Sequence, residues 1–445
     1  MSSERVVRLG VDFGTSFSKL VFRDYGAPGG EKAYVLLKDG KFRVPSAVGV
    51  RDETFIFGVD PSRRRTEGGT VWHESLKMRV AGEGKNDLKH YFHGNALPLP
   101  AGFSAIDVTV LSVWYLISKG KKALKELFAG DRGTLVLGFT LGVPMSFFDD
   151  PDLRETFLRI ARTAWEMSNT AAEDSVSFED AEDLLQNAQA LLATRGNVSA
   201  DSVKDWIRPE AEAALWWPFV SPSTSVDCPY AQLDVGAGTT NISIFRITPH
   251  RTEFGWGKGS LSFFGAVSPP VGMDLIDRAI AEEKGDSDLL KWRGREDEVL
   301  YGKKGEQLIS PEIKQLSNAH QNLLYKAFST ILKAPSERLA WKSHRLFFLG
   351  GGSLNDCITK GLRVSPLDDG QLLTSCDLDV PPDIRLMDGA SVHVSMFPHL
   401  AVAYGLSVLS ADLPDVETPS QVPPMASPAA RPPNYLVIEM DDWRY

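Results

Sequence analysis

Two segments of the sequence place an aspartate at the end of an apolar, strand-like run, directly before a turn of small residues. The two aspartates are Asp12 and Asp234. The turn residues are Gly14, Thr15 and Ser16 after Asp12, and Gly236, Ala237, Gly238 and Thr239 after Asp234. Small residues let backbone N–H groups and hydroxyls approach an anion closely. An adjacent aspartate can hold hydrated Mg²⁺, which prefers carboxylate, water and phosphate oxygens. The two hairpins together predict a site that clasps a polyphosphate.

Other phosphate-binding loops do not fit the sequence. No G-x-x-x-x-G-K-[ST] segment occurs, which disfavours a Walker-type nucleotide hydrolase. Gly236 and Gly238 could begin a dinucleotide fingerprint, but its third glycine is missing. In addition, the residues from Ile242 to Ile247 are typical of a strand where that fold needs a helix.

A third glycine cluster follows an apolar run that ends at Leu349. It consists of Gly350, Gly351, Gly352 and Ser353, and it precedes a segment from Asp356 to Leu362 that could form a helix. Glycines there would let a flat ring or a ribose lie on the backbone, and a helix N-terminus favours nearby anions.

In this order, the three segments resemble the phosphate 1, phosphate 2 and adenosine motifs of the actin, Hsp70 and sugar-kinase ATPase superfamily. Shorter segments resemble the nucleotide-binding domain of Hsp70, over roughly residues 5 to 410. They are Val44-Pro-Ser46 with Phe57-Gly58, the run from Leu141 to Phe147, the run from Ile207 to Leu215, the run from Val271 to Asp274, and the run from Ala401 to Gly405.

The resemblance implies an α/β fold with two actin-like ATPase lobes, which are duplicated RNase H-like units with smaller inserted subdomains. We expect the first lobe at 1–229, with a subdomain insertion at about 40–105 and a helical insertion at about 169–205. We expect the second lobe at 230–410, with an inserted subdomain at about 280–330.

The resemblance also implies roles for individual residues. Asp12 and Asp234 hold Mg²⁺ through water, Lys19 neutralises phosphate charge, and Glu210 orients the attacking water. The expected nucleotide-binding residues are Gly14, Thr15, Ser16, Gly236, Ala237, Gly238, Thr239, Asn241, Gly350, Gly351, Gly352 and Ser353. ATP, ADP and Mg²⁺ are the implied ligands.

Several residues depart from the family pattern. Asn241 stands where a second phosphate 2 aspartate is usual, and Asn355 replaces an arginine that stacks on adenine. Lys19 occupies the lysine position of actin-like proteins, while Arg63 is a weaker candidate for the Hsp70 lysine. For Glu210, a solvated position at a helix start is the alternative to a catalytic role, and Glu212 is a rival.

We therefore expect a Mg²⁺-dependent ATPase, slow or inactive given Asn241, whose lobe closure acts as a switch for partner proteins, as in an atypical chaperone. There are two alternatives. One is a filament-forming actin-like protein, which would have to self-associate, and the other is a small-molecule kinase. Seven prolines lie between Pro414 and Pro433. Hence 411–433 is predicted to be a linker rather than a substrate-binding domain, and 434–445 a docking segment for a partner.

Charge and cysteine content bound the remaining possibilities. The chain has 445 residues, with 48 Lys and Arg against 58 Asp and Glu, and a net charge of −10. This balance disfavours nucleic-acid binding. The three cysteines lack metal-site or disulfide spacing, which favours a reducing compartment such as the cytoplasm. No apolar run is long enough to predict a membrane span.

The elements that must position these residues follow from hydrophobic periodicity. Strands are predicted from Val6 to Val11, Lys19 to Arg23, Leu135 to Val143, Tyr230 onward, and Arg345 to Leu349. Helices are predicted from Ser104 to Leu127, Asp149 to Met167 and His399 to Ser410, with a polar helical zone at 272–343.

Overall fold

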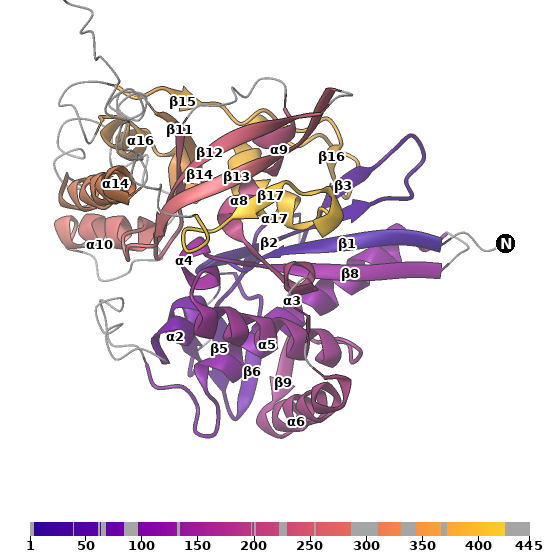
Figure 1. Cartoon of the computed structure of the whole chain (residues 1–445). Coiled ribbons are helices and arrows are strands. Elements are labelled where there is room, and N and C mark those ends of the chain that lie inside the picture. Colours follow the sequence, from indigo (N-terminus) through magenta and orange to yellow (C-terminus); the bar gives the residue numbers. More distant parts are fainter. Residues whose placement is uncertain are drawn as a thin grey trace, which may run out of the picture.

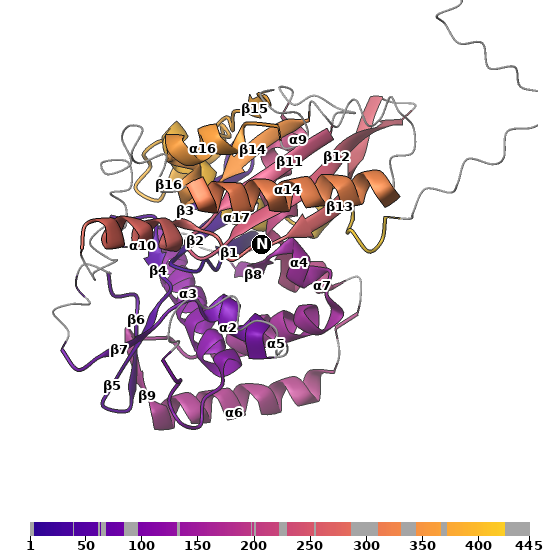
Figure 2. The ribbon, with the colours of Figure 1, turned by 90° about the vertical axis from the view of Figure 1, so that its left-hand side faces the viewer.

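The computed structural model describes residues 4–38, 40–60, 63, 68–83, 97–130, 134–196, 198–199, 202–221, 229–252, 255–285, 310–330, 344–365 and 372–422. These residues form an α/β protein with two large mixed β-sheets and a small antiparallel sheet (Figures 1 and 2). The predicted docking segment at 434–445 lies outside the described residues.

The first sheet has the strand order β10-β8-β1-β2-β3-β16, and β4 pairs with β2. Its strands are β1 (Glu4–Asp12), β2 (Phe17–Asp24), β3 (Lys32–Val35), β4 (Val44–Pro45), β8 (Thr134–Val143), β10 (Ile207–Pro209) and β16 (Ile384–Leu386). β1, β2 and β3 form an antiparallel meander, and β8 and β10 continue the sheet in parallel with β1. β1 is buried from Val7 onward, as its apolar run predicts.

The second sheet repeats this arrangement, with the order β15-β14-β11-β12-β13-β17. Its strands are β11 (Pro229–Val235), β12 (Thr240–Thr252), β13 (Gly255–Val267), β14 (Arg345–Leu349), β15 (Ser375–Cys376) and β17 (Asp415–Glu417). Again, three strands form an antiparallel meander, and two more follow in parallel with the first. The shared order is compatible with duplicated RNase H-like lobes.

A third, four-stranded sheet is formed mainly by the region predicted as an insertion at about 40–105. Its strands are β5 (Val48–Arg51), β6 (Thr54–Phe57), β7 (Val71–His73) and β9 (Ser175–Ser177). β9 was not predicted, because its three residues precede a long helical pattern within 169–205. Figures 1 and 2 place this sheet and α6 (Phe178–Arg195) at the opposite end of the molecule from α14 (Ser310–Thr330) and α16 (Asp356–Leu362).

Helices pack on the sheets and between them. The remaining helices are α2 (Leu76–Glu83), α3 (Ala105–Leu127), α4 (Met145–Phe148), α5 (Pro151–Met167), α7 (Val203–Trp206), α8 (Glu210–Ala214), α9 (Trp216–Val220), α10 (Met273–Glu283), α14 (Ser310–Thr330), α16 (Asp356–Leu362) and α17 (Phe397–Leu406), with 3-10 turns η3 (Gly351–Leu354), η4 (Val394–Met396) and η5 (Ser410–Asp412). α3 begins with a capping box between Ser104 and Asp107, as predicted for a helix start there.

α17 joins the two halves of the molecule, because it packs against β1, β2 and α8 and also contacts β14. Two glycines allow this close approach. A Cβ at Gly10 would lie 2.6 Å from the backbone nitrogen of Ser407, and one at Gly405 would lie 2.8 Å from the Cα of Ala213. Larger residues at either position would push α17 away from its neighbours.

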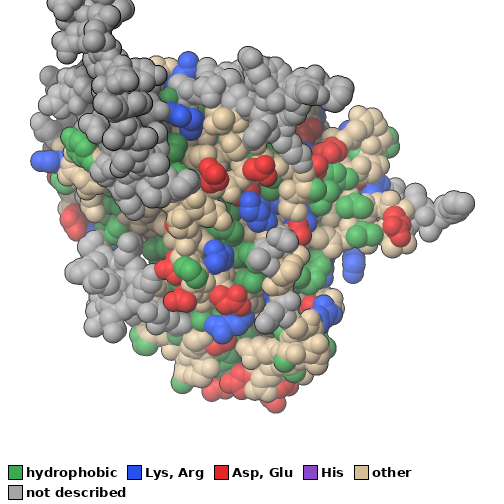
Figure 3. All heavy atoms as spheres, viewed as in Figure 1, with side chains coloured by type: hydrophobic (Ala, Val, Ile, Leu, Met, Phe, Trp, Pro, Cys, Tyr) green, Lys and Arg blue, Asp and Glu red, His purple; other side chains and the backbone are tan. Residues whose placement is uncertain are grey.

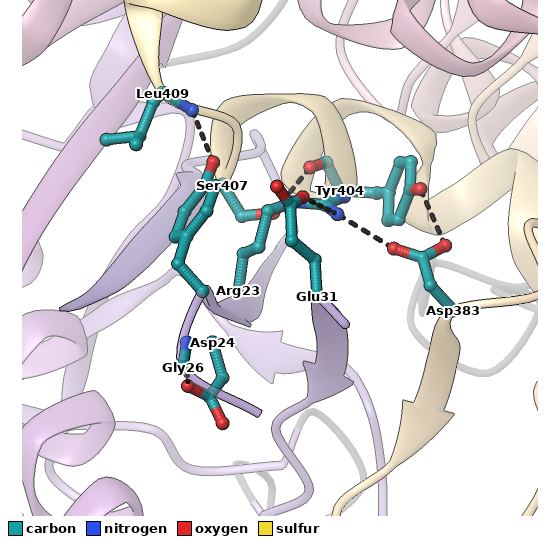
Figure 4. Close-up of polar contacts among 9 residues, drawn as sticks. Arg23, Asp24, Gly26, Glu31, Asp383, Tyr404, Ser407 and Leu409 are labelled. Carbon is teal, nitrogen blue, oxygen red and sulfur yellow. Dashed lines mark hydrogen bonds and ion pairs between the residues drawn. The ribbon is translucent and has the colours of Figure 1, made fainter. Parts of the chain in front are cut away.

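Polar contacts fix the same helix to the first sheet (Figure 4). Arg23 on β2 pairs with Asp383 at 2.7 Å, and the Tyr404 hydroxyl donates to the same carboxylate at 2.8 Å. The Arg23 guanidinium also lies over the Tyr404 ring, 4.6 Å from its centroid. These contacts tie residues from opposite ends of the sequence together.

The end of α17 is capped by a buried arginine. Arg208 on β10 donates to the carbonyl oxygens of Gly405 at 2.9 Å and Val408 at 3.1 Å. A cation near a helix C-terminus is favourable, because the last carbonyl groups carry partial negative charge. Burial, together with the positive charge of Arg8, lowers the pKa of Arg208 to about 10, so its guanidinium stays charged at neutral pH.

The start of the predicted linker is part of the fold. β17 pairs in parallel with β13, and the Ser262 hydroxyl donates to Glu417 at 2.6 Å. Further on, the Ser420 hydroxyl donates to Asp149, between α4 and α5, at 2.5 Å. The segment is extended, as its composition predicts, but residues 415–422 are docked rather than free.

On the face drawn in Figure 3, acidic and basic side chains are interspersed rather than gathered into one area of a single charge. Within the part of the chain that the structure describes, no helix is both long and apolar enough to cross a bilayer.

Candidate functional site

The two predicted hairpins have matching geometry. In β1 and β2, Asp12 lies opposite Lys19, and in β11 and β12, Asp234 lies opposite Asn241. Each turn therefore presents a strand-end aspartate beside a polar side chain from the returning strand. In the first hairpin the two groups form an ion pair, with 3.0 Å between Lys19 Nζ and Asp12 Oδ2.

The two turns touch each other. A Cβ at Gly238 would lie 2.9 Å from Thr15 Cγ2, so any larger residue would have to displace the Thr15 methyl group. The second turn is closed by a hydrogen bond from the Gly236 N–H to the Thr239 carbonyl oxygen at 2.9 Å. The N–H of Met273, the first residue of α10, donates to the Gly236 carbonyl at 3.0 Å. The hairpins therefore face each other across a shared space.

The third glycine segment closes the same space from the end of β14. Gly350 has a φ of +77°, and a Cβ there would collide with the Asp234 carboxylate and lie 2.5 Å from the Val235 carbonyl oxygen. Only glycine suits this conformation and this contact. Its N–H donates to the Pro398 carbonyl at 3.1 Å, which joins the segment to α17.

A cavity of about 250 Å³ lies where the three segments meet. The predicted residues that line it are Asp12, Gly14, Thr15, Ser16, Lys19, Glu210, Asp234, Gly236, Ala237, Thr239, Asn241, Gly350, Gly351 and Gly352. Gly238 and Ser353 do not line it. Gly238 instead packs on Thr15, and the Ser353 hydroxyl donates to the Gly350 carbonyl at 2.7 Å, which stabilises the turn.

Glu210 is buried at the start of α8, which rules out the solvated position considered for it. One carboxylate oxygen forms an ion pair with Lys77 on α2, and the other accepts a hydrogen bond from the Asn241 side-chain amide at 3.3 Å. Its rival Glu212 is also buried, but it does not line the cavity. Of the two glutamates, only Glu210 can therefore act on a ligand there.

Lys77 lines the cavity although sequence reasoning did not select it. It is 6% exposed and comes from the inserted region, through the helix that follows β7. Arg63, the weaker lysine substitute considered from the sequence, lines a different cavity. The sequence offers one sign that Lys77 is buried. It lies between two apolar residues, Leu76 and Met78, which are both buried at the start of the short helix α2.

Burial shapes the electrostatics of the cavity. Burial, together with the negative charges of Glu210 and Asp12, raises the pKa of Asp234 to about 7. Burial is also the main cause that raises the pKa of Glu210, against the opposing effect of Lys77. For Lys19, burial opposes the charged form, but the carboxylates of Asp12, Asp234 and Glu210 raise its pKa overall. The cavity therefore holds three carboxylates, those of Asp12, Asp234 and Glu210, beside the cationic side chains of Lys19, Lys77 and Arg43.

His399 and Arg43 also line the cavity, and neither was predicted. Burial lowers the pKa of His399 to about 3, with Lys19 and Arg43 adding to the effect, so the imidazole is neutral near pH 7. Its ring lies edge-on to Phe42, with 5.7 Å between the centroids. No local pattern around His399 in the sequence marks it as a cavity residue.

Asn355 lies away from the cavity lining and caps a helix instead. Its side-chain oxygen accepts from the Ile358 N–H at 3.2 Å, at the start of α16. This contact explains why a residue with a short side-chain acceptor suits this position.

The cavity combines carboxylates, ammonium groups, an amide and turns rich in N–H donors. Among the described residues, no three Asp, Glu, His or Cys side chains are grouped so as to hold a metal ion by themselves. Such a donor set suits a hydrated divalent cation that takes its other ligands from water and from an anion. Neither a scan of known protein families nor a search of curated proteins finds a match to this sequence.

Proposed function

We propose that this protein binds Mg²⁺ and ATP between two actin-like lobes and hydrolyses the nucleotide as a conformational switch for partner proteins. The observation that carries the proposal is the convergence of three segments, far apart in the sequence, on one cavity. Each of these segments was selected for its resemblance to a nucleotide-binding motif of the actin and Hsp70 superfamily.

The residues present fit a magnesium ion. Asp12 and Asp234 would hold it through water, and the side-chain oxygen of Asn241 is buried without a hydrogen-bond partner among the described residues. That oxygen could accept a hydrogen bond from a metal-bound water. When bound, Mg²⁺ would neutralise part of the phosphate charge.

The protein groups would act on the phosphates and on the attacking water. Lys19 and the N–H groups of the two turns would stabilise negative charge that develops during transfer to water. Glu210 would accept a hydrogen bond from that water and orient it, and Lys77 would favour the ionised form of the Glu210 carboxylate and hold it in position. The loss of the second phosphate 2 carboxylate at Asn241 leads us to expect slow turnover.

The contacts of α17 support a switch. This helix contacts β1 and β2 of the first sheet, β14 of the second, and, through the Pro398 carbonyl, the cavity turn at Gly350. A ligand that binds to both sheets would favour one relative arrangement of the lobes, which a partner protein could recognise.

The test is to measure nucleotide binding and phosphate release by the full chain with Mg²⁺. We expect ATP binding that needs the metal, and at least a tenfold loss of affinity in Asp12→Ala. The control is Asp183→Ala, because Asp183 is exposed on α6 and is not among the residues that line the cavity. Undetectable ATP binding by the intact protein, or equal loss in both variants, would contradict the proposal.

A further inference from the structure

A small cavity adjoins the candidate nucleotide site on the side of α4 and α8. The two cavities share Glu210, Asp234 and Asn241. The smaller one has a volume of about 10 Å³ and is lined by residues of these two helices and of β11, β12 and β13. That volume is close to what one water molecule needs, and it excludes a larger ligand. The proposed hydrolysis does not use this cavity.

The lining is polar because of the alternation of side chains along two paired strands. On β11, Gln232 and Asp234 lie two residues apart, on the same face of the sheet. On β12, Ser243 lies opposite Gln232 and Asn241 lies opposite Asp234, and all four residues line the cavity. Gln232 is only 1% exposed, a position that glutamine rarely occupies. A polar side chain this deeply buried normally has a hydrogen-bond partner in the protein or in ordered water.

Two side-chain oxygens that belong to residues of this cavity are acceptors without a donor. The Oε1 of Gln232 and the Oδ1 of Asn241 are both buried, and neither has a hydrogen-bond partner in the part of the chain that the structure describes. The two residues are diagonal neighbours on paired strands, about 7–8 Å apart, which is within reach of long side chains. Two acceptors cannot bond to each other. A water molecule has two O–H donors and could serve both oxygens at once.

We propose that this cavity binds a water molecule that donates to Gln232 Oε1 and Asn241 Oδ1, and that Gln232 thereby acts as a positioning residue for Glu210. The second part rests on the proposed ATP hydrolysis. An amide oxygen can accept two hydrogen bonds, so Asn241 can still accept from a metal-bound water. The hydroxyls of Ser146 and Ser268, which lie 3.0 Å apart, belong to the same lining and offer the buried water further partners.

The water would act on Glu210 through the orientation of the Asn241 amide. The Nδ2 of Asn241 donates to Glu210 Oε2 at 3.3 Å. A flipped amide would instead turn its oxygen towards the carboxylate, and two acceptors repel each other. A donor that Gln232 holds on the oxygen side of the amide favours the observed orientation. Glu210 is then held by Asn241 on one oxygen and by Lys77 on the other.

The binding of water can be tested without a nucleotide. The experiment is a high-resolution crystal structure of the ligand-free full chain, with rubidium as the monovalent cation in the crystallisation buffer. We expect the density of one water molecule, about 2.5–3.0 Å from both side-chain oxygens and without anomalous signal. No density between the two oxygens would overturn the proposal. An anomalous peak there would also overturn it, because the occupant would be a cation.

The positioning role is tested with Gln232→Met, which keeps the length of the side chain but removes its acceptor. We expect single-turnover phosphate release to slow at least fivefold, while the affinity for ATP changes less than twofold, because Gln232 does not line the nucleotide cavity. The matched control is Thr109→Val, which removes another buried oxygen without a partner among the described residues, outside both cavities. The control should release phosphate as fast as the unmodified chain. Equal rates in all three proteins, or a parallel loss of rate and ATP affinity in Gln232→Met, would contradict a positioning role.

Urea unfolding of the ligand-free proteins gives a further measurement that needs no ATP. Removing a buried acceptor that has no partner should leave the stability unchanged or raise it, which we expect for Thr109→Val. Removing an acceptor that binds water should lower the urea midpoint, which we expect for Gln232→Met. A higher midpoint for Gln232→Met would contradict the water site. If this variant does not fold, as judged by circular dichroism, Gln232→Leu provides the same comparisons.

Failure of this inference can be told from failure of the proposed function. Undetectable ATP binding by the unmodified chain would contradict the proposed hydrolysis and the positioning role of Gln232 with it. The crystal structure and the urea midpoints would still decide whether the water is bound. Conversely, normal phosphate release without a bound water would leave the ATPase in place and overturn the inference alone.

Discussion

At the scale of single residues, the cavity at the junction of the sheets concentrates ionisable groups that water would otherwise solvate. Sequence reasoning selected Asp12 and Asp234 from the local pattern of their hairpins, and Lys19 from the resemblance to actin-like proteins. It missed Lys77 and His399, which reach the cavity only through tertiary packing. A hairpin is a local feature, whereas a contact between an inserted region and α8 is not.

Removing one partner of the buried ion pair between Lys77 and Glu210 should be strongly destabilising, although the pair as a whole contributes little net stability. Both side chains are buried, so Lys77→Gln leaves an uncompensated carboxylate and should cost about 3–5 kcal/mol in the free energy of unfolding. The double variant Lys77→Gln/Glu210→Gln should recover most of that loss. Urea unfolding measures both effects.

A matched control for that pair is Lys121→Gln. Lys121 is partly buried and donates to the Ser168 hydroxyl at 2.7 Å and to the Ser168 carbonyl oxygen at 3.1 Å, and its ammonium group lies 4.4 Å from the centroid of the Trp165 ring. Its replacement should cost about 1–2 kcal/mol, less than the loss expected at Lys77. Similar losses at Lys77 and Lys121 would argue against a special role for the buried pair.

Asp234 should make the ligand-free protein less stable as the pH rises. Burial raises its pKa from 3.8 to about 7, so the folded state holds a proton that the unfolded state has lost between these values. This contribution to stability is present below about pH 4 and is lost as the pH rises through 7. In Asp234→Asn this part of the pH dependence should disappear. Thermal unfolding of both proteins between pH 4.5 and 8 tests the sign, and identical profiles would contradict it.

At the scale of elements, the strand and helix predictions were confirmed where the pattern is long or bounded by clear signals. The strand Arg345–Leu349 matches its prediction, and α3 and α5 end at the predicted residues Leu127 and Met167. The short strands β9 and β17 were not predicted. Three residues carry too little periodicity to show a strand, and both pair with segments distant in the sequence.

The Gly350 turn should tolerate no side chain. Gly350→Ala would force a left-handed residue and also push a methyl group into the Asp234 carboxylate and the Val235 carbonyl. We expect a loss of about 3 kcal/mol or more, with reduced ATP affinity. Gly389 is the control, because it has a φ of +88° but no neighbouring atom within 4 Å of the place that a Cβ would take. Gly389→Ala should cost only about 1 kcal/mol of backbone strain; equal costs in urea unfolding would show that the cavity contact is unimportant.

At the scale of the whole molecule, the repeated strand order links two halves that the sequence had already suggested through its paired hairpins. In each sheet, three consecutive strands pair in antiparallel fashion, and two later strands extend the sheet in parallel with the first strand. What could not be predicted is that the chain returns to the first sheet after building the second. β16 pairs with β3, and α17 covers β1 and β2. Pairing at this separation leaves no mark in local periodicity.

Because β16 and α17 complete the first sheet from the C-terminal half of the sequence, the behaviour of fragments can be predicted. A fragment of residues 1–228 lacks β16 and α17, so it should be insoluble or molten when produced alone. Produced together with residues 229–445, it should form a soluble complex, because the missing elements are then supplied by the second fragment. Size-exclusion chromatography with circular dichroism distinguishes the outcomes. A stable, cooperatively folded fragment 1–228 would show that the first sheet folds without β16 and α17.

The return of α17 to β1 also bears on synthesis at the ribosome. β1 is among the first elements to emerge, yet the helix that covers it emerges only after the second sheet has been made. Domains generally fold as units, beginning with the N-terminal part of the nascent chain. Here the first sheet must wait, with part of its apolar surface uncovered, until α17 leaves the exit tunnel. We therefore expect completion of the fold to be a late event in synthesis.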